Sequence, residues 1–163
     1  MTQPSPQHAL TYSPRSPDLR RRARGFTLLE MLVVVTILGV LVAYAMPTFR
    51  KAVEQSGVNM AAANLETIWT AERLYLAQNQ MFTGSLTDLQ NAGLLDLNFV
   101  NALNNSSKFQ YAISAPEPAS GFSATATRIN SGHWSGQLGI TESGTLSGLI
   151  TGKWGEKITP AGQ

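Results

Sequence analysis

The sequence has no cysteine and only two histidines in its 163 residues. Without cysteine, the chain can form no disulfide, no thiolate metal site and no cysteine nucleophile. Only His133 lies beyond residue 25, and the acidic residues are spread singly, so a zinc site or a Ser-His-Asp triad lacks the side chains it needs. GxGxxG and complete P-loop patterns are also absent. We therefore expect no enzyme, no cofactor and no bound metal.

Charged residues make up only 13% of the sequence, and the positive ones gather at its front. Residues 1–25 hold five arginines and one acidic residue, whereas the rest of the chain holds 7 basic and 9 acidic residues. A surface that binds nucleic acid needs clustered cations to neutralise phosphates. The scattered cations after residue 25 therefore disfavour nucleic acid as a partner.

A long apolar run follows the arginines. Residues 1–19 are rich in Pro, Ser, Thr and Gln without periodicity, which predicts disorder. The 21 residues Phe26–Met46 are almost wholly apolar, and as a helix they would measure about 31 Å, close to the hydrocarbon thickness of a bilayer. Because arginines precede this run and few charges follow it, the positive-inside bias places the N-terminus in the cytoplasm. The pattern predicts one membrane-spanning helix and an extracytoplasmic remainder.

One carboxylate interrupts the predicted span, at Glu30. A carboxylate on a lone spanning helix costs about 2.5–3.5 kcal/mol on insertion scales, and such residues usually face a partner. Cleavage between Gly25 and Phe26 would create an ammonium group four residues before Glu30. If one chain's ammonium neutralised the carboxylate of the next chain, that pairing would set the axial register of packed copies.

Two simpler interpretations explain the hydropathy equally well. A secretory signal peptide would use the small residues Ala43–Ala45 as its cleavage site and release a soluble domain. An uncut signal anchor would instead tether an extracytoplasmic binding module to the membrane. Neither interpretation accounts for Glu30, but both remain open as alternatives to a processed, polymerising chain.

The stretch RGFTLLEMLVVVTILGVLVAYAMP resembles the N-terminal signature of type IV pilins and of type II secretion pseudopilins. The positions that carry the resemblance are Gly25, Phe26, Thr27, Leu28, Glu30, Gly39 and Pro47. It implies that a prepilin peptidase removes residues 1–25 and N-methylates Phe26, and that Glu30 is the assembly residue. It also implies a structural subunit of a pilus or pseudopilus, located in the inner membrane and later in a periplasmic or cell-surface filament.

The resemblance further implies partners. They would be copies of the chain or related subunits, the peptidase, an inner-membrane platform protein, an assembly ATPase and an outer-membrane secretin. The leader of 25 residues is long for relatives that begin with phenylalanine, and the missing cysteine pair favours a pseudopilin over many adhesive pilins. The choice between pilus and pseudopilus, and between major and minor subunit, stays open.

Gly39 and Pro47 are unfavourable residues inside a helix, where they cost about 1 and about 3 kcal/mol respectively. Pro47 has a simple interpretation, since it can mark the exit of the helix from the membrane. The resemblance implies another, in which the stretch between these two residues loses helicity during assembly. The sequence leaves both interpretations open.

Beyond Pro47 the helical pattern continues to about Gln80, which predicts one helix roughly 80 Å long. Its second half has an apolar stripe with spacings of three and four, formed by Val58, Ala61, Leu65, Ile68, Ala71 and Tyr75. Four polar residues are expected to lie mostly off this stripe, namely Glu54, Asn59, Glu66 and Arg73. The expected division is a leader at 1–25, a transmembrane and polymerisation half at 26–47 and a pilin-like head at 48–163.

The remaining sequence predicts a connector and a small sheet. A turn at Thr83–Gly84 precedes a short helix capped by Ser85 or Thr87 and ending near Gly93. Four segments read as strands: 109–114, 121–129, 138–140 and 146–150. We therefore expect an α+β fold in which three or four antiparallel strands cover the apolar stripe.

Few residues of the predicted head suggest a binding site. His133 lies in a Gly/Ser-rich segment and is expected to be an exposed or turn residue. Trp134 and Trp154 could anchor a partner, although burial against the helix is the commoner fate of tryptophan. Calcium binding, which the resemblance to some major pseudopilins would imply, is not expected because Glu142 and Glu156 offer too few clustered oxygens.

Overall fold

The computed structural model describes residues 25–117 and 119–161. The chain divides into two compact units, up to Leu41 and from Val42 onward. The leader predicted at residues 1–25 lies outside the described residues apart from Gly25. The same holds for the segment predicted to be disordered, so both stay predictions.

The first element, α1, is a single helix of 52 residues, Leu28–Asn79, with Pro47 inside it. Its C-terminal end agrees with the predicted one. Gln80 ends the helix in a left-handed conformation with φ 60°, and its N–H donates to the carbonyl of Leu76 over 2.8 Å. A residue with positive φ directs the chain away from the helix axis and so terminates the helix.

The apolar stripe in the second half of α1 is buried as predicted. Five of its six predicted members are at most 2% exposed, and the sixth, Tyr75, is half-buried. One polar residue was placed wrongly, because Glu54 is only 4% exposed and lies on the stripe. Glu72 is also fully buried there. Both acids continue the spacing of three and four, so their positions on the helix followed the pattern although their charge argued against burial.

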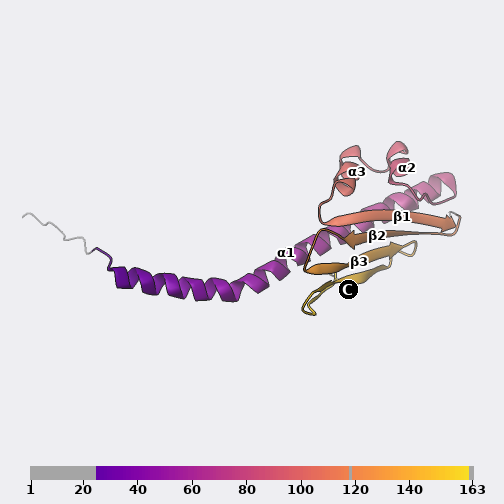
Figure 1. Ribbon diagram of the computed structural model, residues 1–163. Coiled ribbons are helices and arrows are strands. Elements are labelled where there is room, and N and C mark those ends of the chain that lie inside the picture. The colour runs from indigo at the N-terminus through magenta and orange to yellow at the C-terminus, as the bar shows by residue number, and fades with distance from the viewer. Residues whose placement is uncertain (1–24, 118, 162–163) are drawn as a thin grey trace, which may run out of the picture. The chain divides into compact units, whose positions relative to one another are not determined.

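Five strands form one sheet in the order β1-β2-β3-β4-β5, with every neighbouring pair antiparallel. The strands are β1 Phe109–Glu117, β2 Gly121–Arg128, β3 Trp134–Thr141, β4 Leu146–Gly152 and β5 Lys157–Ile158. The predicted α+β class, a long helix packed on an antiparallel sheet, is confirmed (Figure 1). The additional strand is β5, whose two residues are too few for a periodic pattern and pair with Ile150 and Thr151.

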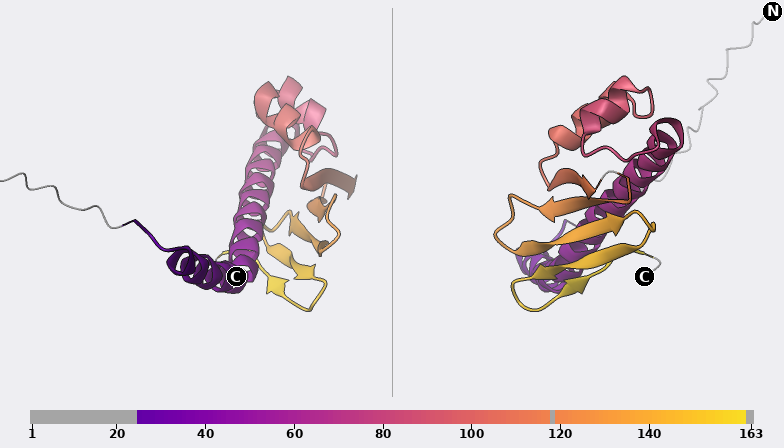
Figure 2. Two further views of the ribbon diagram at one scale, coloured as in Figure 1. Left: turned by 60° about the vertical axis from the view of Figure 1, so that its left-hand side comes forward. Right: turned by 90° about the vertical axis from the view of Figure 1, so that its right-hand side faces the viewer.

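Two short helices connect α1 to the sheet: α2, Leu86–Asn91, and α3, Leu97–Asn104. Ser85 caps α2 as predicted, since its hydroxyl accepts a hydrogen bond from the N–H of Asp88 over 3.3 Å. α3 was not predicted. Its cap is Asp96, whose carboxylate accepts from the N–H of Asn98 over 2.7 Å. Figure 2 shows both helices beside the β1 edge of the sheet.

The main core of the head lies between the sheet and the second half of α1. From α1 it contains Val58, Leu65 and Ile68, and from the sheet Phe122, Ala124, Ala126, Leu138, Ile140 and Ile150. The predicted alternation along β2 is confirmed, because Phe122, Ala124 and Ala126 are buried at every second position. A second cluster joins Ala71 to Leu89, Leu95 and Val100 beneath the two short helices.

Glu72 is the most deeply buried ionisable residue of the helix–sheet core, with no exposed surface. Its Oε2 accepts a hydrogen bond from the N–H of Thr83 over 2.9 Å, whereas Oε1 has no partner among the described residues. The Thr83 hydroxyl in turn donates to Asp88 over 3.1 Å. Burial raises the pKa of Glu72 from 4.5 to about 7, against the opposing effect of the hydrogen bond from Thr83.

The burial of Glu72 predicts that the free energy of unfolding falls as pH rises. Between pH 4.5 and about 7 the folded chain keeps a proton on Glu72 that the unfolded chain releases, so rising pH favours unfolding. The pKa shift corresponds to a change of roughly 3 kcal/mol in the free energy of unfolding. Glu72→Gln is expected to remove this pH dependence, as measured by urea unfolding of the full chain in detergent. Glu66→Gln, an exposed position on the same helix, should leave the dependence unchanged. Equal profiles for wild type and Glu72→Gln would contradict the assignment.

Candidate functional site

Thr27 and Glu30 form reciprocal hydrogen bonds at the N-terminus of α1. The backbone N–H of Glu30 donates to the Thr27 hydroxyl over 3.2 Å, and the N–H of Thr27 donates to Glu30 Oε2 over 3.4 Å. This reciprocal arrangement is a capping box, in which a threonine and a glutamate three residues later satisfy free N–H groups of the first turn. The predictions missed it, although its signal, T-L-L-E, stands in the sequence.

The capping box does not neutralise Glu30. Its partners are a hydroxyl and an amide, and no cation of residues 25–117 or 119–161 forms an ion pair with this carboxylate. Both capping groups lie after the Gly25–Phe26 bond, so cleavage there would leave them in place. The arrangement is therefore compatible with a second, ionic partner on another chain.

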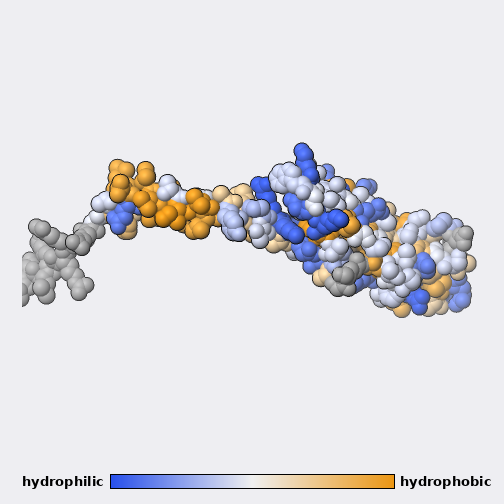
Figure 3. All heavy atoms as spheres, turned by 90° about the horizontal axis from the view of Figure 1, so that it is seen from below, coloured by the Kyte–Doolittle hydropathy of each residue, from blue (hydrophilic) through white to orange (hydrophobic). Residues whose placement is uncertain are grey.

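The residues around Glu30 present apolar side chains on all sides. An 18-residue window of α1 has a mean hydropathy of 2.5, and none of it is buried within the chain. Phe26, Leu28 and Leu29 are 67%, 85% and 73% exposed. Figure 3 shows apolar side chains gathered over this first part of the helix. By length and composition the helix can cross a membrane, and its exposed apolar surface needs lipid or another helix to cover it.

Neither Gly39 nor Gly25 is explained by packing within the chain. A Cβ added at either position would meet no atom within 4 Å. Glycine inside a helix costs about 1 kcal/mol relative to alanine, and Pro47 inside α1 removes a backbone hydrogen bond as well. Gly39 and Pro47 are therefore two weak points of the helix, and no packing among the described residues explains the glycine.

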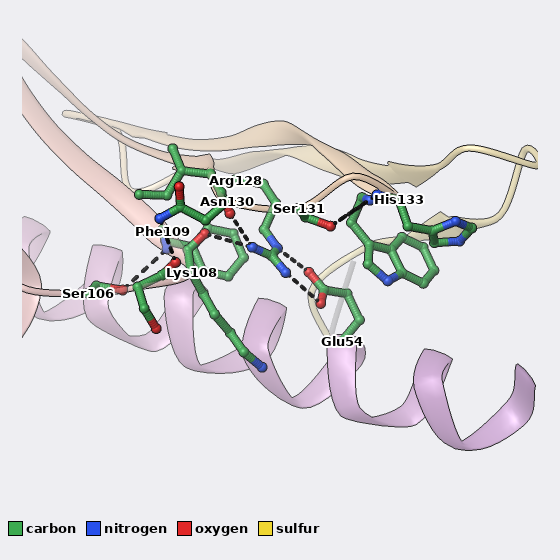
Figure 4. Close-up of polar contacts among 11 residues, drawn as sticks. Glu54, Ser106, Lys108, Phe109, Arg128, Asn130, Ser131 and His133 are labelled. Carbon is green, nitrogen blue, oxygen red and sulfur yellow. Dashed lines mark hydrogen bonds and ion pairs between the residues drawn. The ribbon is translucent and has the colours of Figure 1, made fainter. Parts of the chain in front are cut away.

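Further along α1, after Pro47, Glu54 forms a buried ion pair with Arg128 of β2. The Nε and Nη2 of Arg128 donate to the two carboxylate oxygens over 2.5 and 3.1 Å, and the two side chains are 7% and 5% exposed. Nη1 also donates to the carbonyl oxygens of Lys108 and Ile129, and the guanidinium lies 5.6 Å from the ring centre of Phe109. Figure 4 shows Arg128 reaching from the sheet to the helix.

His133 has more contacts than a simple turn residue. Its Nε2 lies 3.2 Å from Glu156 Oε1, and its ring contacts those of Trp134 and Trp154 at 4.8 and 4.6 Å between centres. The expectation that both tryptophans pack against the helix is wrong for one of them, since Trp134 is 8% exposed and Trp154 is 76% exposed. The position of Trp154 in a turn after β4, which only the folded chain reveals, explains the difference.

Metal ligands do not gather in the described part of the chain. Residues 25–117 and 119–161 contain no group of three or more His, Asp or Glu side chains that could hold an ion. Glu142 lies after β3, where its carbonyl accepts from Trp69 Nε1 over 3.1 Å, whereas Glu156 pairs with His133. The structure does not bring these two acids into one calcium site.

Comparison with known proteins addresses the N-terminal segment. A family model described as the prokaryotic N-terminal methylation motif matches residues 20–46. The match includes Gly25, Phe26 and Glu30 at the positions given above. The chain therefore carries a segment similar to this methylation motif.

Three relatives are similar to the chain over part of its length. The type IV major pilin protein PilA of Myxococcus xanthus is 37% identical over 62 residues, which cover 38% of this chain and 28% of the relative. The type II secretion system core protein G of Pseudomonas aeruginosa is 34% identical over 71 residues, 44% of this chain and 50% of the relative. The type IV wide pilus major component PilA4 of Thermus thermophilus is 30% identical over 74 residues, 45% of this chain and 56% of the relative.

The matches thus span between about a quarter and a little over half of the relatives' own lengths. Two relatives are named as pilus components and one as a secretion-system protein, so the similarity extends to both branches of the family. The family-model match covers only residues 20–46, which include the first part of α1.

Proposed function

We propose that the chain is the precursor of a structural subunit of a type IV pilus or a type II secretion pseudopilus. In this proposal a prepilin peptidase cuts between Gly25 and Phe26 and N-methylates Phe26, and the processed helix packs with copies of itself. The observation that carries the proposal is an exposed apolar helix with a carboxylate, Glu30, whose partners among residues 25–117 and 119–161 are all neutral. The matching methylation motif and the named relatives support it.

The precursor would sit in the inner membrane with its N-terminus in the cytoplasm and its head outside. In the filament the apolar first half of α1 would pack against neighbouring helices, which replace lipid as the covering for its side chains. Gly39 and Pro47 would let the helix lengthen locally during that transfer, since nothing in the chain packs against Gly39. The platform protein, assembly ATPase and secretin would be the machinery of this step.

The mass of the mature N-terminus tests the proposal. The purified chain is expected to begin at Phe26 with one added methyl group on its amine, as read by mass spectrometry of the N-terminal peptide. A start at Met1 would support an uncut anchor carrying a binding module, and a start at Met46 would support a secreted domain. Either result would contradict the proposal.

Gly25→Leu provides the matched control for that experiment. A Cβ at position 25 would meet no atom of the described residues within 4 Å, so the variant is expected to fold and insert normally. It is expected to keep its leader because the peptidase cuts next to this glycine. Cleavage of the variant at the same bond and rate would show that another protease produces the mature end.

A further inference from the structure

A groove of about 770 Å³ lies beside α1 within the unit that begins at Val42. Helix residues between Ala43 and Glu54 line it on one side, and head residues, among them Lys108 and Trp154, line it on the other. The lining is largely apolar. Phe49 and Trp154 are 68% and 76% exposed, so the chain itself leaves these two large side chains uncovered.

The exposed Trp154 is held in place. Its N–H donates to Glu156 Oε2 over 3.1 Å, and its ring centre lies 4.6 Å from that of His133. Hydrogen bonds from the backbone N–H groups of Glu156 itself and of Trp154 lower the pKa of the Glu156 carboxyl. A Cβ at Gly152 would lie 2.3 Å from this carboxylate, so only glycine leaves room for it. The turn thus presents an ordered tryptophan to the outside.

Three cations line the groove without an ion-pair partner in the described part of the chain. They are Arg50, Lys51 and Lys108. The two acids of the lining, Glu54 and Glu156, are paired with Arg128 and His133. None of the three cations forms an ion pair with another residue of the described ranges 25–117 and 119–161. The groove therefore combines an apolar lining with an excess of positive charge.

The groove lies where the helix leaves the predicted span. Arg50 follows Met46 by four residues, which is about 6 Å along a helix, and the headgroup layer of a bilayer extends about 5–8 Å beyond its hydrocarbon core. Tryptophan is enriched in that layer. The positive-inside bias predicts few cations on this side, so the pair Arg50–Lys51 needs another explanation.

We propose that this groove binds anionic phospholipid headgroups of the leaflet at which α1 leaves the membrane. The phosphate would lie among Arg50, Lys51 and Lys108, and the upper acyl chain would contact Phe49 and Trp154. A lipid fits better than a second copy, because the lining continues the lipid-facing surface of the span and its free charges are all positive. The inference rests on the proposed membrane span alone, and it applies to the chain before or after processing.

Quenching of tryptophan by brominated lipids tests the contact. The full chain is placed in vesicles of phosphatidylcholine mixed equally with phosphatidylglycerol, whose acyl chains carry bromine either near the headgroup or near the bilayer centre. We expect strong quenching by the shallow label and weak quenching by the deep one. Trp154→Phe should remove most of it, whereas Trp69→Phe, whose ring lies away from the groove against Glu142, should keep it. Equal quenching in both variants would overturn the proposal.

Charge removal tests the role of the cations. Lys51→Gln combined with Lys108→Gln removes two exposed charges from the lining and should lower the ratio of docked to undocked head about 25-fold on anionic vesicles, given the usual attraction of a lysine to such a surface. Arg73→Gln combined with Lys157→Gln removes the same charge outside the groove and should change little. If the two pairs behave alike, the groove does not select the headgroup.

Varying the ratio of protein to lipid distinguishes lipid from a second copy of the chain as the occupant of the groove. Quenching of Trp154 that persists as the chain is diluted into excess lipid supports headgroup docking. Quenching that is independent of phosphatidylglycerol would show that the groove does not select anionic headgroups. A groove that is shielded from lipid only at high protein density would assign the surface to contacts between copies. Either result would overturn this inference and leave the proposed filament subunit intact.

Discussion

Glu30→Ala is expected to abolish filament assembly while leaving membrane insertion intact or improved. Removing the carboxylate lowers the insertion cost by about 2.5–3.5 kcal/mol. In the assembled state, however, the ammonium of the neighbouring Phe26 would be buried without a partner. Breaking one side of a buried pair costs about 3–5 kcal/mol, which corresponds to a loss of at least a hundredfold in subunit addition. The measurement is the yield of sedimentable filaments at equal membrane levels of subunit.

Two further variants separate charge from helix capping at this site. Glu30→Gln keeps an oxygen that can accept from the N–H of Thr27 but loses the charge, so it should fail like Glu30→Ala. Thr27→Val loses the capping hydroxyl but keeps the charge, so it should assemble with a modest loss. Glu66→Ala, an exposed acid in the second half of α1, controls for net charge. Assembly of Glu30→Gln at wild-type levels would refute the ionic role.

Arg128→Ala is expected to destabilise the head by about 3–5 kcal/mol, because it leaves Glu54 buried and unpaired. The same change removes the hydrogen bonds from Arg128 to the carbonyl groups of Lys108, just before β1, and Ile129, just after β2. The Lys108 carbonyl keeps its hydrogen bond from the N–H of Ile129. Urea unfolding of the full chain in detergent, followed by tryptophan fluorescence, measures the loss. Arg73→Ala, at an exposed position where the guanidinium lies 5.8 Å from the centre of the Trp69 ring, should change stability by no more than about 1 kcal/mol.

Replacing both partners distinguishes a structural ion pair from a functional one. The double variant Glu54→Leu with Arg128→Met fills the same space without charge and should recover most of the lost stability. Full recovery of filament assembly would indicate that the pair only joins helix to sheet. A double variant as unstable as Arg128→Ala would contradict the view that the unpaired charge causes the loss.

The helix and its ends could be predicted because their signals are local. Spacing of three and four placed Val58, Leu65 and Ile68 on one buried face, and Gln80 ended the helix within a residue of the prediction. The serine cap of α2 was equally local. The missed capping box at Thr27 and the missed cap at Asp96 belong to the same class, since both patterns stand in the sequence.

The buried acids could not be placed by such signals. The prediction placed Glu54 off the stripe. A lone carboxylate argues for exposure, and only the ion pair with Arg128, 74 residues further along the chain, makes its burial possible. Glu72 is buried with a backbone N–H as its partner, at the cost of a raised pKa. The environment of His133 likewise depends on Glu156, which joins it through the pairing of β3, β4 and β5.

By itself, the sequence determined the long apolar helix, the position of its acid, the stripe on its second half and the α+β class, because each depends on residues close together along the chain. Only the tertiary structure decided which charges are buried, that Trp154 is exposed while Trp134 is not, and that three cations share one groove with them. These features depend on which side chains meet after distant segments pack. Such contacts depend on the free energy of the whole fold, so no single stretch of residues carries a pattern that predicts them.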